Sequence, residues 1–188
     1  RFAEAMTRHT SEVDVHHAGR FAGLGTRHNV NHWGDSAKEV RISAAFLKRP
    51  YYYLTTDERT GDLMREVLAV DEKLAEVQPL RKTLPRPDVP IVIRSGPDWI
   101  ALASNWLTEW ERTGDVRYRD YVLSGMKSLG AMPESFLNRI AYRYDPKTKQ
   151  LFDIGEPNIR TYEFVVLFGG DQIAYEIMQL IDCPEFKR

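Results

Sequence analysis

The pentapeptide Glu58-Arg59-Thr60-Gly61-Asp62 is repeated further along the chain as Glu111-Arg112-Thr113-Gly114-Asp115. Glycine readily ends a helix in the left-handed conformation, and aspartate is a preferred cap of the helix that follows. Each Thr-Gly-Asp sequence therefore predicts a tight turn between two helices. Two such turns in a chain of 188 residues indicate a fold built from helical hairpins.

The sequence on both sides of the second copy fits an amphipathic helix, because its apolar residues recur with helical spacing. The stripe before the turn contains Trp99, Leu102, Ala103, Trp106, Leu107 and Trp110. The stripe after the turn contains Tyr118, Tyr121, Val122, Gly125 and Leu129. We therefore predict one helix on each side of this turn, with the tryptophans in the core.

The first copy is followed by a stripe of the same kind, so it too predicts a helix. That stripe contains Leu63, Val67, Val70, Leu74 and Val77. Residues 38–56 before the copy are rich in apolar side chains, but Pro50 predicts a kink or a break there. A further stripe from Val165 to Ile181 predicts another helix near the end of the chain.

Residues 140–153 depart from helical spacing and predict an inserted β-hairpin, because two alternating segments flank a turn at 145–149. The fold class we expect is mainly α, with helical hairpins that form part of an (α/α) toroid. Irregular insertions favour the toroid over a regular solenoid. Because the helix at 165–181 has no following partner helix, we expect residues 1–188 to be one partial toroid domain of a longer enzyme.

Composition excludes several classes of protein. The chain has 26 basic and 27 acidic residues, so it has no general positive charge for nucleic acid and no polybasic segment for a membrane surface. No apolar run approaches the roughly 18 residues of a membrane-spanning helix. Cys183 is the single cysteine, which excludes an internal disulfide and a cysteine-rich metal site.

The candidate site lies in residues 23–41, a stretch with glycines, two histidines and two asparagines ahead of an expected helix. Cleaving a uronate chain by β-elimination needs a group that neutralises the carboxylate, a base for the C5 proton and an acid for the leaving oxygen. We assign His28 and His32 as base or acid, and Arg41 with Asn31 as the neutralising pair. The remaining substrate contacts we expect come from Asn29, Trp33, Asp35, Lys38 and Tyr52, with Trp33 stacking on a sugar ring.

Other interpretations of this segment stay open. His28 and His32 are four residues apart, which suits a transition metal only on a helix, and glycine and asparagine indicate a loop instead. We therefore expect no metal cofactor, although oxygen-bound calcium stays open. The polar side chains also suit a loop that satisfies its own backbone groups. As functions, a toroid glycoside hydrolase for uronyl sugars, with Asp35 as acid or base, and a helical-repeat binding module are the alternatives to a lyase.

The stretch Arg27-His28-Asn29-Val30-Asn31-His32-Trp33-Gly34-Asp35, followed by Lys38-Glu39-Val40-Arg41 and Arg49-Pro50-Tyr51-Tyr52-Tyr53, resembles the α/α-toroid part of the exo-acting rhamnogalacturonan lyases, polysaccharide lyase family 26. The similarity covers about residues 20–130. It implies a secreted or periplasmic lyase that cleaves galacturonate–rhamnose chains of pectin by β-elimination. Its partner is then an acidic oligosaccharide or polysaccharide, and the rest of the parent chain is needed for activity.

Overall fold

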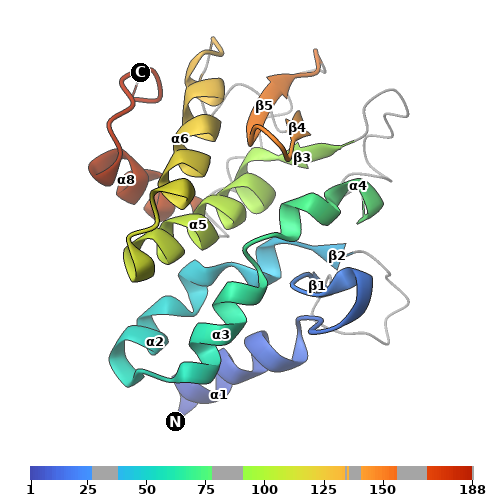
Figure 1. Ribbon diagram of the computed structural model, residues 1–188, viewed down its shortest axis with the longest axis vertical. Coiled ribbons are helices and arrows are strands. Elements are labelled where there is room, and N and C mark those ends of the chain that lie inside the picture. Colours follow the sequence, from blue (N-terminus) through green and yellow to red (C-terminus); the bar gives the residue numbers. More distant parts are fainter. Residues whose placement is uncertain (27–37, 78–90, 134, 136–140, 156–168, 188) are drawn as a thin grey trace.

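The computed structural model of the protein describes residues 1–26, 38–77, 91–133, 135, 141–155 and 169–187. The fold is mainly helical, with two small antiparallel sheets (Figure 1). The α-helices are α1 Phe2–Arg8, α2 Arg49–Thr55, α3 Glu58–Glu66, α4 Leu74–Val77, α5 Ile100–Thr113, α6 Val116–Gly130 and α8 Gly170–Leu180. The strands are β1 Gly25–Thr26, β2 Lys38–Glu39, β3 Val92–Arg94, β4 Ala141–Asp145 and β5 Gln150–Asp153. In the part of the chain so described, no helix has the length and apolar character to cross a membrane.

Helix α5 forms the centre of the core, because it packs against both α6 and α8 and its residues from Ile100 to Glu109 are all buried. A single π-helical turn, Ser95–Trp99, leads into it. Trp99 and Trp106 have no exposed surface, as predicted from the stripe. The indole nitrogen of Trp106 donates to the carbonyl of Leu68 at 3.1 Å, which ties α5 to the chain that follows α3.

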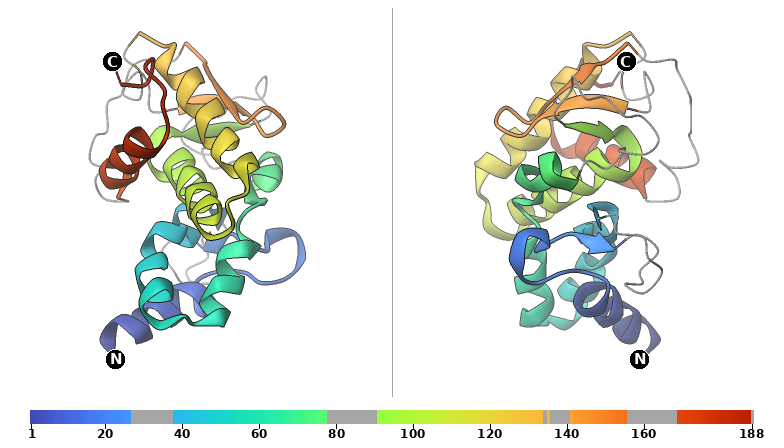
Figure 2. Two further views of the ribbon diagram at one scale, coloured as in Figure 1. Left: turned by 60° about the vertical axis from the view of Figure 1, so that its left-hand side comes forward. Right: turned by 90° about the vertical axis from the view of Figure 1, so that its right-hand side faces the viewer.

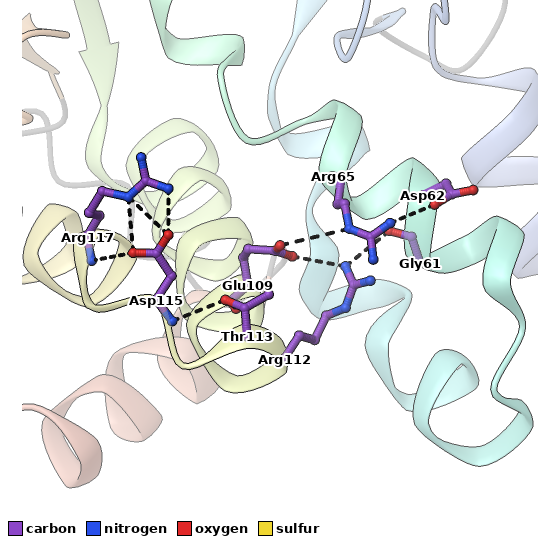
Figure 3. Close-up of polar contacts among 8 residues, drawn as sticks. All are labelled: Gly61, Asp62, Arg65, Glu109, Arg112, Thr113, Asp115 and Arg117. Atoms are coloured by element: carbon purple, nitrogen blue, oxygen red, sulfur yellow. Dashed lines mark hydrogen bonds and ion pairs between the residues drawn. The ribbon is translucent and has the colours of Figure 1, made fainter.

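The second pentapeptide forms the predicted turn between α5 and α6. Gly114 lies in the left-handed region with a φ of 72°, so the absence of a side chain is favourable there. The Thr113 hydroxyl donates to the carbonyl of Glu109 at 2.7 Å and accepts from the N–H of Asp115 at 3.2 Å. Asp115 then accepts from the N–H of Arg117 at the start of α6 (Figure 3). The prediction for this hairpin is confirmed.

The first pentapeptide does not form the turn, and that prediction is wrong. Gly61 lies inside α3, and the turn between α2 and α3 comes earlier, at Thr55, Thr56 and Asp57. Thr56 takes the left-handed position with a φ of 54°. Asp57 caps α3 by accepting from the N–H of Thr60 at 3.0 Å. The earlier Thr-Thr-Asp sequence supplies the same hydroxyl and carboxylate as the later Thr-Gly-Asp.

The two pentapeptides instead meet in space. Arg112 of the second copy donates to the carbonyl of Gly61 in the first copy at 3.1 Å and pairs with Glu109 at 3.0 Å. Arg65 of α3 reaches the other oxygen of Glu109 at 4.0 Å (Figure 3). Gly61 is needed for this approach, because a Cβ there would lie 2.9 Å from the ring of Tyr52 and 3.0 Å from the Arg112 guanidinium.

The break predicted at Pro50 is confirmed, and its cause is that Pro50 lies in the first turn of α2, where its missing N–H costs nothing. Two short 3-10 helices, Arg41–Ser43 and Ala45–Leu47, precede it. The helix predicted over 63–77 is also interrupted. α3 ends at Glu66, and a 3-10 turn over Val70–Lys73 leads into α4. The predicted stripe is nevertheless buried throughout.

The predicted β-hairpin is confirmed, since β4 and β5 pair from Tyr142 with Asp153 to Asp145 with Gln150. The sheet has a third strand, β3, which pairs with β4 and was not predicted. A buried polar group joins this sheet to the helices. Asp71 accepts from the Tyr144 hydroxyl at 2.8 Å and from the Lys149 ammonium at 2.6 Å.

Helix α8 packs on α5 through Ile173 and Ile177, which have no exposed surface, as its stripe predicted. Residues 165–168 of that predicted helix lie outside the described residues. Along the long axis of the molecule, α1, α2 and α3 lie at one end, while α5, α6, α8 and the three-stranded sheet lie at the other (Figures 1 and 2). The β1–β2 ribbon lies beside the helices of the first group.

Candidate functional site

The β1–β2 ribbon holds both ends of the candidate segment. Gly25 pairs with Glu39 and Thr26 with Lys38, so residues 27–37 join the two strands. Of the predicted site residues, His28, Asn29, Asn31, His32, Trp33 and Asp35 lie outside the described residues. Leu24 and Val40, one residue beyond each strand, are fully buried. The core therefore fixes the positions of the two strands that residues 27–37 connect.

The ribbon lies close to the protein body because of Gly25. A Cβ on Gly25 would lie 2.2 Å from a side-chain carbon of Ile42, so no larger residue fits without a shift. The preceding chain also pairs with the ribbon, through a bridge between Val15 and Gly25 and a 3.0 Å bond from the His16 N–H to the carbonyl of Leu24. This bridge brings His16 to the base of the candidate segment.

Two predicted residues, Lys38 and Arg41, lie at this base. The Lys38 ammonium is 5.4 Å from the centroid of the Phe21 ring, and the Arg20 guanidinium is 4.5 Å from the same centroid. The His16 ring lies 5.9 Å from that of Phe21. Burial, helped by the positive charge of Lys38, lowers the pKa of His16. The base of the segment therefore combines cationic side chains with an imidazole that is neutral at pH 7.

Arg41 belongs to a buried network of opposite charges. Its Nε forms an ion pair with Glu39, and the same Glu39 oxygen lies 3.5 Å from the Arg94 guanidinium. Arg94 also forms a two-pronged pair with Asp98, at 2.8 and 2.9 Å. Burial would lower the pKa of Arg94, but Asp98 and Glu39 outweigh it, and the pKa is raised. This network fastens β2 to the strand and turn that lead into α5.

Tyr52 lies in a different group from Lys38 and Arg41. Its ring packs under the Arg112 guanidinium, 4.7 Å from centroid to carbon, and beside Gly61. The structure thus assigns Tyr52 to the contact between α2, α3 and α5. Its predicted role in substrate binding stays a prediction.

A second cluster of titratable groups lies behind the ribbon and was missed in the sequence. Lys48, just before α2, is almost completely buried, and burial lowers its pKa to about 8. Asp14 is also buried, burial raises its pKa, and its carboxylate pairs with His9 at 3.4 Å. His17 pairs with Glu66 of α3 at 2.7 Å. Isolated charges in a sequence give no signal of such burial, so pattern alone could not reveal this cluster.

One hollow in the described surface, of about 430 Å³, lies on α8. It is lined by Asp171, Gln172, Tyr175 and Glu176. Of its two carboxylates, that of Glu176 pairs with the Arg49 guanidinium of α2. Among the described residues, no three histidine, cysteine, aspartate or glutamate side chains gather as metal ligands.

Comparison with known proteins fits this architecture. Residues 1–188 match the family described as the PcRGLX-like protein C-terminal alpha/alpha toroid domain. The chain belongs to this family. The fold class predicted from the pentapeptides, with its helical hairpins and inserted β-hairpin, is therefore confirmed, and so is the resemblance to the toroid portion of rhamnogalacturonan lyases.

A relative of this PcRGLX-like toroid domain is the uncharacterized protein YetA of Bacillus subtilis (strain 168). The two sequences are 46% identical over 187 residues, which cover 100% of this chain and 22% of YetA. The chain thus spans about a fifth of the length of this relative. The family match makes this chain the toroid domain of a rhamnogalacturonan lyase-like protein.

Proposed function

We propose that this domain belongs to a polysaccharide lyase that cleaves uronate-containing pectic chains, such as rhamnogalacturonan, by β-elimination. The observation that carries the proposal is the set of side chains at the base of the candidate segment. There the strands that are connected by residues 27–37, here called the His-Asn segment, lie beside Lys38, Arg41 and the neutral imidazole of His16. Family membership supports the same substrate class.

The cationic groups of the base suit the first requirement of the reaction. A uronate carboxylate beside Lys38 and Arg41 is partly neutralised, which acidifies the C5 proton. Arg41 pairs with Glu39 through Nε, and we propose that the same guanidinium carries positive charge toward the carboxylate of the substrate. The Glu39–Arg94–Asp98 network keeps Arg41 in one place, so the guanidinium does not have to be ordered when substrate binds.

The imidazoles suit the remaining requirements. A neutral histidine accepts the C5 proton, the bond between C4 and the glycosidic oxygen breaks, and a C4–C5 double bond forms. An acid, His28 or His32, returns a proton to the leaving oxygen. Burial beside Lys38 lowers the pKa of His16, so the base of the segment already holds one uncharged imidazole at neutral pH. Trp33, Asn29, Asn31 and Asp35 are proposed to hold the sugar.

The protein is further proposed to act outside the cytoplasm, in the extracellular space or the periplasm, where pectic chains are found. No resident metal is required by the scheme, and calcium enters only as an additional neutralising charge. The rest of the parent chain is proposed to complete the cleft.

The test uses the full-length protein and a rhamnogalacturonan substrate. Elimination produces an unsaturated uronate that absorbs ultraviolet light, whereas hydrolysis produces reducing ends without that absorbance. We expect absorbance, and we expect His28→Ala and His32→Ala each to reduce turnover by about 10²–10⁴-fold. Reducing ends without absorbance would favour the toroid glycoside hydrolase with Asp35 as acid or base. Binding without any cleavage would favour a helical-repeat binding module.

A further inference from the structure

The first helix of the chain exposes its large apolar residues to solvent. In α1 and the π-helical turn His9–Val13 that continues it, the buried residues are Thr7 and Ser11. The large apolar side chains point to solvent, with Phe2, Met6 and Val13 exposed by 81%, 46% and 60%. A surface helix of a globular protein normally turns its apolar side to the core. This helix does the opposite.

The side of α1 that faces the protein is held by polar contacts. Arg8 lies 3.7 Å from Asp57, the cap of α3, and Glu12 lies 3.8 Å from Arg59. The Ser11 hydroxyl is buried without a hydrogen-bond partner. The burial of Thr7 and Ser11 defines the side of the helix that faces the protein, so the apolar side faces solvent in this fold. The helix lies at one end of the molecule, with α2 and α3 beside it (Figures 1 and 2).

We propose that Phe2, Met6 and Val13, here called the α1 stripe, form the docking surface for an apolar helix face elsewhere in the same full-length polypeptide. Phe2 and Met6 are four residues apart in α1 and therefore lie on one side of it, and Val13, exposed by 60%, extends the apolar surface at the end of the π-helical turn. Such a surface can pack against a second helix. The surface would thus continue the stacking of helical hairpins beyond α1.

The length of the relative argues for this occupant. YetA matches the chain along all of its length, yet the match covers 22% of YetA, so most of such a protein lies outside these residues and can supply the covering face. A lipid surface is a poorer partner, because the polar residues of this helix, Glu4, Arg8 and Glu12, alternate in charge. Membrane-surface helices are rich in lysine and arginine on their polar side.

The test is thiol labelling of the native full-length protein in a background without other reactive cysteines. Met6→Cys and Val13→Cys report on the α1 stripe. Glu4→Cys is the matched control on another side of the same helix, and Val116→Cys, at a position exposed by 50%, is a control on α6. We expect the two stripe positions to react at least about tenfold more slowly than both controls, and all four to react alike after unfolding.

Two results would overturn the proposal. If the stripe positions react as fast as Glu4→Cys, nothing covers the stripe in the whole protein. If they are shielded only at concentrations where the protein dimerises, and become reactive on dilution, the occupant is a second copy. Should a cysteine variant fold poorly, Met6→Glu and Val13→Glu give the second measurement. Each is expected to lower the midpoint of thermal unfolding of the full-length protein, whereas Val116→Glu is expected to leave it unchanged.

Discussion

The turn between α2 and α3 and the turn between α5 and α6 share a threonine hydrogen bond and an aspartate cap, although the capped N–H is that of Thr60 in the first and that of Arg117 in the second. In each, a threonine hydroxyl donates at 2.7 Å to the carbonyl four residues earlier, Tyr51 in the first and Glu109 in the second. In each, the following aspartate caps the next helix. The left-handed position between them is Thr56 in the first turn and Gly114 in the second. Threonine and aspartate therefore define this turn, and the glycine only makes it easier.

The two hairpins differ more strongly in what they bury. Both hairpins bury apolar side chains, but the charged group buried in the second, Glu109, pairs with Arg112, whereas the first has the Lys48 amine buried at the start of α2. A charged amine in such a place opposes folding unless it loses its proton. The first hairpin is therefore expected to be the part of the molecule that responds to alkaline pH.

The largest expected effect comes from Lys48. Its pKa falls from 10.5 to about 8 on folding, so the folded state favours the neutral amine. Stability is lowest below pH 8 and rises as the pH increases from about 8 to 10.5, a window that corresponds to about 3 kcal/mol. Chemical denaturation across this range should show the free energy of unfolding of the wild type rising relative to that of Lys48→Met. Parallel curves for the two proteins would show that Lys48 is not the responsible group.

The next largest effect is a difference in stability between substitutions at the two pentapeptide glycines, Gly61 and Gly114. Gly61→Val places a branched side chain against Tyr52 and Arg112, and we expect a loss of about 2–3 kcal/mol in the free energy of unfolding. Gly114→Ala meets no atom within 4 Å and costs only left-handed strain, about 1 kcal/mol. Urea denaturation of both variants measures the difference. An equal cost at the two positions would contradict the different placement of the two copies.

Local signals in the sequence were sufficient for the second hairpin and for β4 and β5, because helical spacing, Gly114 and the turn at 145–149 lie within each element. They failed for the first copy because the actual turn, at Thr55, Thr56 and Asp57, contains no glycine. The glycine nearby, Gly61, lies in the following helix and placed the predicted turn too late. The strand β3 was missed because three residues cannot signal a partner as distant as β4. Long-range contacts of this kind are set by packing rather than by local sequence.

The candidate site also contains residues that local sequence predicts and residues that only long-range contacts bring to it. Lys38 and Arg41 were predicted from their position next to the His-Asn segment, and the ribbon brings them to its base. His16 was missed because its place depends on the bridge between Val15 and Gly25, which no local pattern announces. Tyr52 is close to the segment in sequence but packs on Arg112 in the fold. The roles of His28 and His32 stay predictions.

The cap of the first turn is expected to contribute a smaller, pH-dependent effect. Asp57 accepts two bonds from Thr60, and these lower its pKa. Because the folded state favours the ionised carboxyl, its contribution is present above the ordinary pKa of 3.8 and is lost as the pH falls through the lower folded value. Asp57→Ala should cost about 1 kcal/mol at pH 7. The difference from wild type should shrink in acid, and a difference that does not vary with pH would exclude the carboxylate as its source.

The smallest expected effect is a gain in stability from Thr56→Gly. Thr56 is a β-branched residue at a φ of 54°, a conformation that costs non-glycine residues about 1–2 kcal/mol. Glycine removes this strain but loses the bond from the Thr56 hydroxyl to the carbonyl of Thr55 and has a more flexible unfolded chain. The net gain is therefore about 0.5 kcal/mol, measurable as a higher urea midpoint with an unchanged slope. The variant also makes the first turn Thr-Gly-Asp, so a lower midpoint would mean that the two turns are not equivalent and that Thr56 makes a contribution in its own right.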